Sequence, residues 1–158
     1  MKNTTFKNCN GLPCEGHLST ARDIALMSRE LLKHPTILKY SGTYMETISE
    51  GRKSPIELVN HNKLVRFFEG CDGLKTGFTN EAKYCISATA KRSGVRMLAV
   101  IMGAPTYKIR NRDAGILMNY GFYDRQHRSD GSAVITCTRE KRNGNQMRKM
   151  RRRFTAKR

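Results

Sequence analysis

The sequence predicts an α/β (α+β) fold in which an antiparallel sheet is flanked by helices, and three patterns support this. Residues 84–91 alternate between two kinds of side chain, the period of a strand with two different faces. Residues 96–102 (R-M-L-A-V-I-M) form an apolar run whose length suits a strand buried on both faces. A short turn at 91–94 joins the two strands, so they must be antiparallel, and helical patterns precede and follow the pair.

The first helix has clear start and stop signals. Thr20 and Asp23 form a T-x-x-D start that is typical of a capped helix N-terminus. The sequence His34-Pro35 ends the helix, because the residue before proline is pushed out of the helical region. An apolar stripe at helical spacing follows the cap, and we expect it to belong to the core; it consists of Ile24, Met27, Leu31 and Leu32.

The stretch between this helix and the sheet carries weaker signals. Residues 40–48 favour a strand or an extended loop, because Thr, Tyr, Met and Ile are common in strands. His61 lies in a polar stretch, Asn60-His61-Asn62, and we interpret it as a surface loop histidine rather than a catalytic base.

A third strand, within Gly70–Thr79, carries the most informative residues. Lys75 and Thr76 place an ammonium and a hydroxyl side by side, a combination that suits a carboxylate. Gly77 has no side chain, so a ligand could lie close to the backbone. A Lys-Thr pair on a strand is also compatible with a plain solvated face. Because only a short loop separates this strand from Tyr84, we infer a three-stranded antiparallel meander.

The second helix is predicted from about Tyr107 to Tyr120, with Gly121 as its stop signal. We expect its inward-facing residues to be Ala114, Leu117 and Met118. Arg110 and Arg112 lie in its first turns, where the helix dipole disfavours cations. This placement hints at an anionic partner, although an exposed arginine needs no such reason.

The formal net charge of +17 lies mainly in the last part of the chain. Residues 125–158 hold twelve Lys or Arg against two acidic residues. Residues 132–138 could form one short strand, whereas residues 139–158 are expected to be disordered because they are charged and apolar-poor. This tail could bind nucleic acid non-specifically, but it offers only Phe154 for stacking and no reading motif, so no specific nucleic acid is indicated.

Cofactors, metals and membrane segments receive no support from the sequence. The five cysteines are odd in number and lack a C-x-x-C spacing, which argues against a disulfide framework or a zinc ribbon. Cys9, Cys14 and His17 lie close together, but no second ligand pair follows at zinc spacing. No apolar run reaches the ~18 residues of a membrane span, and the N-terminal residues show no signal peptide.

Several ordered blocks of residues 1–123 point together to one known family. They are N-T-T-F-K-N-x-N-G-L (3–12), G-H-L-S-T-A-R-D-I-A-L-M (16–27), N-K-L (62–64), E-G-C-D-G-L-K-T-G-F-T (69–79), E-A-K-Y-C (81–85) and G-A-P-T-Y-K-I-R (103–110). With these blocks the chain resembles the D-alanyl-D-alanine carboxypeptidases of the low-molecular-mass penicillin-binding proteins, serine peptidase family S11, above all their sporulation-type or Firmicute members. The Lys75-Thr76-Gly77 triplet is one of the three short motifs of that family.

The resemblance implies part of a β-lactamase/transpeptidase-like domain over residues 1–123, followed by a basic, disordered tail over 124–158. It implies an exported enzyme at the outer face of the cytoplasmic membrane that removes the terminal D-Ala from peptidoglycan stem peptides ending in D-Ala-D-Ala, with β-lactams as inhibitors. The substrate would be bound by Lys75, Thr76, Gly77 and Arg110. Of these, Lys75, Thr76 and Arg110 would contact its carboxylate end. The backbone N–H of Phe78 would donate a hydrogen bond to the oxyanion. No cofactor or metal is implied.

The sequence departs from the family pattern in its catalytic motifs. No serine has a lysine three residues on, and no S-x-N is present, so the nucleophile and its base are absent. Family order places both motifs before Asn3, so we expect a longer parent protein whose missing N-terminal fragment carries them. We therefore expect this chain to be inactive alone, with one sheet face uncovered and marginal stability. The arginine-rich tail suggests a frameshift.

Overall fold

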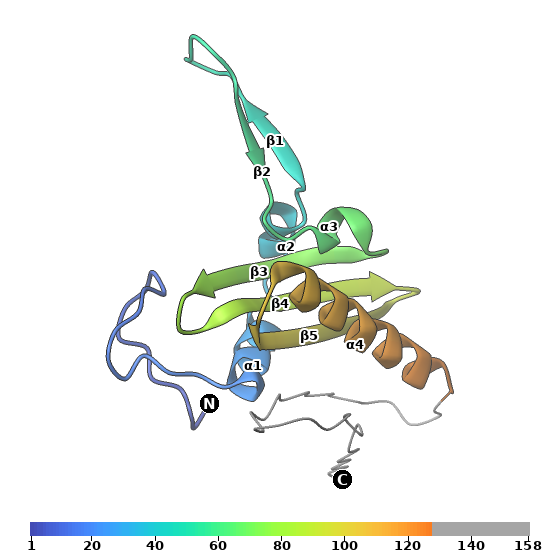
Figure 1. Cartoon of the computed structure of the whole chain (residues 1–158). Helices are drawn as coiled ribbons and strands as arrows, with labels where there is room; N and C mark the ends of the chain where they lie inside the picture. The colour runs from blue at the N-terminus through green and yellow to red at the C-terminus, as the bar shows by residue number, and fades with distance from the viewer. Residues whose placement is uncertain (128–158) are drawn as a thin grey trace.

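A computed structural model describes residues 1–127, and a three-stranded antiparallel sheet forms its centre (Figure 1). The strands are β3 (Cys71–Thr79), β4 (Lys83–Arg92) and β5 (Val95–Ala104), in the order β3-β4-β5. This confirms the predicted meander with Lys75 on one of its strands, and the structure places that strand, β3, at the edge of the sheet. Helix α4 (Tyr107–His127) crosses one face of the sheet, and α1 (Ala21–Leu31) packs against the other.

The two faces of β4 explain why helices lie on both sides. Ile86, Ala88 and Ala90 point towards α4 and pack with Ala114 and Met118, all at most 2% exposed. The small alanines let the helix approach the sheet closely, and burying a side chain such as that of Met118 contributes about 1.5–3 kcal/mol. The alternate residues face α1, where the hydroxyls of Ser87 and Ser28 share a buried hydrogen bond of 2.7 Å.

Strand β5 is buried on both faces at its centre, as its apolar run predicts. Ala99, Val100 and Ile101 are all buried although successive side chains point to opposite faces. Near its end the pairing shifts, since Ile86 faces Ile101 while Tyr84 faces Ala104. This bulge contains Gly103, whose φ of +70° favours glycine.

Helix α1 begins as predicted but packs through a different face. The hydroxyl of Thr20 accepts a hydrogen bond from the Asp23 N–H at 3.2 Å, which caps the helix. The expected core stripe is wrong in part, because Met27 and Leu31 are each 40% exposed. Ala21 and Ser28 are buried instead, since small side chains allow the helix to lie close against the sheet.

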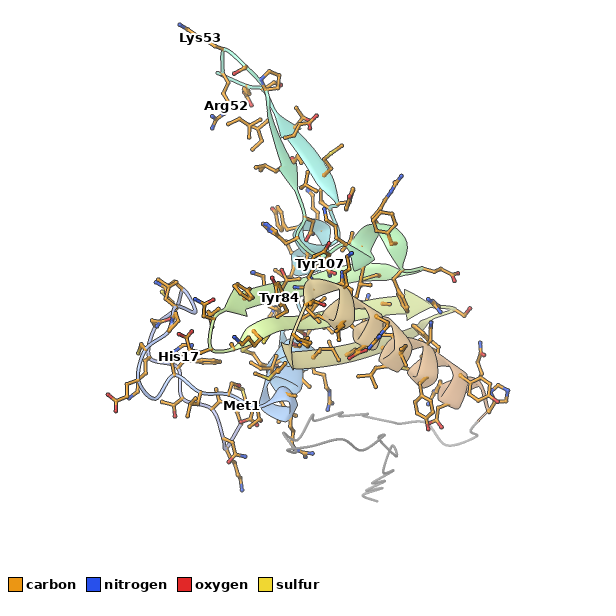
Figure 2. All side chains as sticks on the ribbon, in the orientation of Figure 1. Met1, His17, Arg52, Lys53, Tyr84 and Tyr107 are labelled. Atoms are coloured by element: carbon orange, nitrogen blue, oxygen red, sulfur yellow. The ribbon has the colours of Figure 1, made fainter. Side chains whose placement is uncertain are left out.

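The segment before the sheet holds elements that the sequence did not indicate. Residues 36–41 form helix α2 (Thr36–Ser41), so the strand expected from residue 40 is wrong in its first half; Pro35, with its helical φ, starts this helix instead. Strands β1 (Met45–Ile48) and β2 (Ile56–Val59) form an exposed hairpin that projects from the sheet, with Arg52 and Lys53 near its tip (Figure 2). Helix α3 (Leu64–Phe67) follows, after the exposed His61.

Helix α4 is longer than predicted. It runs past the expected stop at Gly121 and reaches His127, so the disordered tail expected from residue 124 is wrong for residues 124–127, which are helical. Gly121 is buried, and a Cβ there would approach the Met97 sulfur to 2.9 Å, so this glycine serves helix–sheet contact rather than helix termination. The expected strand at 132–138 and the tail at 139–158 lie outside the described residues. Within residues 1–127, no helix has the length and hydropathy needed to cross a membrane.

The N-terminal segment is held to α1 by one buried carboxylate, which predicts an acid-sensitive contact. Asp23 accepts 2.8 Å hydrogen bonds from the Thr4 hydroxyl and the Asn3 N–H, and these lower the pKa of its carboxyl. A depressed pKa stabilises the fold above the unfolded pKa, and this stabilisation is lost as the pH falls through the folded pKa.

We therefore expect Asp23→Asn to lower the urea midpoint at neutral pH and to differ less from wild type at about pH 3 than at neutral pH. Glu15→Gln, an exposed change in the same segment, serves as the control and should leave the midpoint unchanged at both pH values. An equal loss for Asp23→Asn at both pH values would contradict the role of the ionised carboxylate.

Candidate functional site

The outer edge of β3 is covered in its first half and open in its second half. The Ser41 hydroxyl donates to the Asp72 carbonyl at 2.9 Å, and the Asn62 amide donates to the Gly73 carbonyl at 3.1 Å. From Lys75 onwards the strand is largely exposed, up to Phe78 at 53%. Because β3 is the outermost strand of the sheet, alternate main-chain N–H and C=O groups of this half have no strand partner on that side within residues 1–127.

Lys75 and Thr76 lie on this open half but point to opposite faces of the sheet. Thr76 pairs with Ile86, which belongs to the core under α4, whereas Lys75 pairs with Ser87, which faces α1. The Lys75 ammonium donates to the carbonyl oxygen of Thr76, at the exposed strand. The Lys75 ammonium and the Thr76 hydroxyl can therefore bind the same ligand only if that ligand lies at the edge of β3, where both faces of the sheet can be reached.

Gly77 leaves room for a ligand on the same half of β3. A Cβ built there would meet no atom within 4 Å, so the space beside the backbone is open. The neighbouring Phe78 ring packs on Tyr84, with centroids 4.4 Å apart, which holds the end of β3 in place. The site is thus an accessible strand segment on a firm support.

Aromatic contacts connect this end of the sheet to the start of α4. Tyr84 contacts Phe78 on one side and Tyr107 on the other, the latter at 6.4 Å between centroids. Figure 2 shows Tyr84 and Tyr107 close together where α4 begins. Arg110 lies one helical turn after Tyr107, on the same side of the helix, so these contacts help to fix its position.

Arg110 is a buried cation beside the open strand segment. Its side chain is 5% exposed, and its Nε donates to the Asn111 side-chain oxygen at 3.0 Å. Burial lowers the pKa of the guanidinium, while nearby Cys85 and Tyr84 act to raise it. These two residues pair directly with Gly77 and Phe78, so the guanidinium lies one strand away from the open edge of β3.

The structure thus divides the residues singled out in the sequence into two groups. Thr76 and Arg110 lie on the α4 side, and Lys75 lies on the α1 side, with Gly77 and the backbone of Phe78 between them at the edge. In the described part of the chain, no group of three or more His, Cys, Asp or Glu side chains is placed to hold a metal ion.

Sequence reasoning missed the residues that support β3. Asp72 and Arg96 form a bidentate ion pair with both N–O distances at 2.7 Å, and Arg96 also donates to the Thr89 hydroxyl at 3.0 Å. This pair ties β3 to β5 across the middle strand. Asn62 is 1% exposed. Its side-chain oxygen accepts a hydrogen bond from the Leu64 N–H, and its amide donates one to the Gly73 carbonyl. The N-K-L block carried a signal for Asn62, but nothing in the pattern marked Arg96.

Comparison with known proteins gives a consistent result. Residues 1–106 match the family model for D-alanyl-D-alanine carboxypeptidase, Peptidase_S11. The chain is 47% identical over 122 residues to D-alanyl-D-alanine carboxypeptidase DacF of Bacillus subtilis and 34% identical over 123 residues to DacC of Escherichia coli. The aligned parts make up 77% of this chain and 31% and 30% of the two relatives.

Solved structures show the same fold. Penicillin-Binding Protein D2 from Listeria monocytogenes, in its cefotaxime-bound form, superposes with a TM-score of 0.68 at 38% identity, over 75% of this chain and 48% of that one. The Streptomyces K15 DD-transpeptidase superposes with a TM-score of 0.72 at 29% identity, over 78% and 49% of the two chains. The chain therefore spans about a third of the curated relatives and about half of the solved chains it matches.

The buried amide of Asn62 yields a testable prediction about the support of β3. Asn62→Ala should leave the Gly73 carbonyl and the Leu64 N–H without their partners, which costs about 1–3 kcal/mol of unfolding free energy. Chemical denaturation measures this loss. Asn80→Ala, in the exposed turn between β3 and β4, is the matched control and should change stability by less than about 0.5 kcal/mol. Equal effects of the two changes would rule out the proposed support.

Proposed function

Because the chain belongs to the D-alanyl-D-alanine carboxypeptidase family, peptidase S11, we propose that the open half of β3 binds the D-Ala-D-Ala end of a peptidoglycan stem peptide. The observation that carries this proposal is the position of a buried guanidinium beside an exposed Lys-Thr-Gly strand. An extended peptide can lie against the unpaired main-chain groups of such an edge and add one more strand.

Thr76 and Arg110 hold the terminal carboxylate of the peptide. Both lie on the α4 side of the sheet, where the hydroxyl supplies a neutral donor and the guanidinium a planar, charged one. The burial of Arg110 strengthens its attraction for an anion, because less water screens the charge. Gly77 lets the peptide backbone approach closely.

Lys75 acts from the other side of the edge. Its ammonium lies on the α1 side, where it raises the positive potential along the peptide without competing for the same carboxylate oxygen. The backbone N–H of Phe78 serves as a donor to the oxyanion that forms when the penultimate carbonyl is attacked.

The reaction proposed for the complete site is acyl transfer. A serine attacks the penultimate D-Ala carbonyl, the terminal D-Ala leaves, and water hydrolyses the acyl-enzyme. No serine of this sequence has a lysine three residues on, so the serine–lysine pair would come from outside these 158 residues. The part played by these 158 residues is recognition of the substrate, at the outer face of the cytoplasmic membrane where peptidoglycan precursors lie.

β-Lactams are the inhibitors that this site would accept. The Listeria relative has been crystallised in cefotaxime-bound and ampicillin-bound forms. A β-lactam carries a carboxylate next to a reactive carbonyl, as the D-Ala-D-Ala terminus does, so the same Thr76 and Arg110 would receive it.

The binding role is tested by titrating the chain with acetyl-D-Ala-D-Ala and following amide chemical shifts by NMR. We expect shifts at Thr76, Gly77 and Phe78, and affinity reduced at least about tenfold by Arg110→Gln, since a charge-assisted hydrogen bond contributes about 1.5–3 kcal/mol. Thr76→Val should weaken binding less. Lys108→Gln removes an equal charge from an exposed position on the same helix and is the control.

Two results would contradict the proposal. Equal binding of acetyl-L-Ala-L-Ala, or equal weakening by Lys108→Gln and Arg110→Gln, would reduce the interaction to unspecific charge attraction. Covalent labelling of the chain by a fluorescent penicillin would contradict the statement that the nucleophile lies outside it.

A further inference from the structure

We propose that the groove between α3 and α4 binds an aromatic carboxylate, and that Asn111 transmits its occupation to Arg110. The groove has a volume of about 350 Å³, at the small end of the range for small-molecule sites. It lies on the β3 side of the sheet, because α3 contacts β3 (Figure 1). The residues singled out for substrate binding do not line it, so it is separate from the open half of β3.

The α4 wall of the groove is a single face of the helix. Its residues recur at helical spacing and are Asn111, Arg112, Gly115, Ile116 and Asn119. Ala114 and Met118 lie on another face of α4, where they are buried against the sheet. The groove therefore borders the core without being part of it.

The apolar surface of the groove is mainly aromatic. Gly115 faces the Phe68 ring, and a Cβ built on this glycine would lie 3.4 Å from two of the ring carbons. The buried Leu64 also lines the groove, whereas the Phe67 ring at its rim is 75% exposed. Aromatic rings attract one another when they stack with an offset or meet edge to face. These surfaces therefore favour a ligand with an aromatic body.

The charged side chains of the groove are cationic. Lys63 lies on the α3 wall and Arg112 on the α4 wall, and no described lining residue carries a carboxylate. Arg112 shares its charge with the neighbouring Asp113 at 2.9 Å, whereas no carboxylate within residues 1–127 lies at ion-pair distance from Lys63. The Lys63 ammonium lies 5.4 Å from the centroid of the Tyr44 ring, which helps to position it. An anionic group is the natural complement of this cation.

The charge of the chain indicates that the ligand comes from outside it. Residues 125–158 hold twelve Lys or Arg against two acidic residues, so Lys63 and Arg112 repel this segment. A second copy, with a formal net charge of +17, is disfavoured in the same way. An aromatic carboxylate meets both requirements of the groove, because it joins an apolar ring system to one negative charge.

Asn111 links the groove to Arg110. Its side-chain oxygen accepts a hydrogen bond from the Arg110 Nε–H at 3.0 Å, and the same side chain lines the groove. Arg110 is 5% exposed, so water cannot easily replace this partner. A ligand that contacts the Asn111 side chain therefore alters the hydrogen bond of Arg110, and the Arg110 Nε–H signal reports that the groove is occupied.

The test titrates the full 158-residue chain with 2-naphthoate and follows amide and arginine Nε–H signals by NMR. We expect saturable binding with a Kd of about 1 mM or tighter, and shifts at Phe68, Gly115 and the Arg110 Nε–H. The amide signals of Gly77 and Phe78 should stay in place. 2-Naphthamide has the rings without the charge and acetate has the charge without the rings, so each should bind at least about tenfold more weakly. These ligands need no variant, so they decide the matter even if substitutions impair folding.

A matched pair of substitutions locates the charge. Lys63→Gln should raise the Kd for 2-naphthoate at least about fivefold, because it removes the cation that has no carboxylate partner among the described residues. Arg66→Gln removes an equal charge from an exposed position on α3 outside the groove and should change the Kd less than about twofold.

Four results would overturn the proposal. They are the absence of saturation, equal binding of 2-naphthamide or acetate, equal effects of Lys63→Gln and Arg66→Gln, and shifts confined to Gly77 and Phe78, which would place the ligand at the open half of β3. Saturable binding in the groove that leaves the Arg110 Nε–H signal unshifted would contradict the link through Asn111.

Discussion

The ion pair between Asp72 and Arg96 fixes the outer strand on which the site is built. It spans the sheet from β3 to β5 over the Thr89 hydroxyl, and both of its N–O contacts are 2.7 Å long. An isolated pair that is partly exposed contributes on the order of 1 kcal/mol, but this one acts together with the hydrogen bonds of Ser41 and Asn62 to the same strand. The first half of β3 is held firmly, so the second half can remain open without leaving the sheet.

This arrangement separates the supported half of β3 from the open half, which we propose binds the substrate. The supporting contacts end at Gly73, and the exposed Lys-Thr-Gly segment begins two residues later. On the α4 side, the ring contacts of Tyr84 with Phe78 and Tyr107 join the open segment to the helix that carries Arg110. The sheet therefore presents a hydroxyl and a buried guanidinium on one side of an accessible edge and an ammonium on the other.

The sheet and the Lys-Thr-Gly segment could be predicted because local patterns determine them. The alternation in residues 84–91 and the apolar run in 96–102 directly reflect which side chains are buried. The packing of α1 could not be predicted from its apolar stripe, because Ser28 finds a partner in Ser87, 59 positions later in the chain. The position of Gly121 after an apolar pattern predicts a helix stop, but this glycine instead allows close contact with Met97, which only the tertiary structure reveals. The opposite orientations of Lys75 and Thr76 follow from the two-residue period of a strand. The position of Arg110 near the open half of β3 could be known only from the folded structure.

The most direct test of this account is a crystal structure of the chain with acetyl-D-Ala-D-Ala bound. The account predicts that the peptide lies along the open half of β3 and that its carboxylate lies about 3 Å from both the Thr76 hydroxyl and a guanidinium nitrogen of Arg110. A peptide bound elsewhere, or a carboxylate held by Lys75 alone while Arg110 points away, would contradict it.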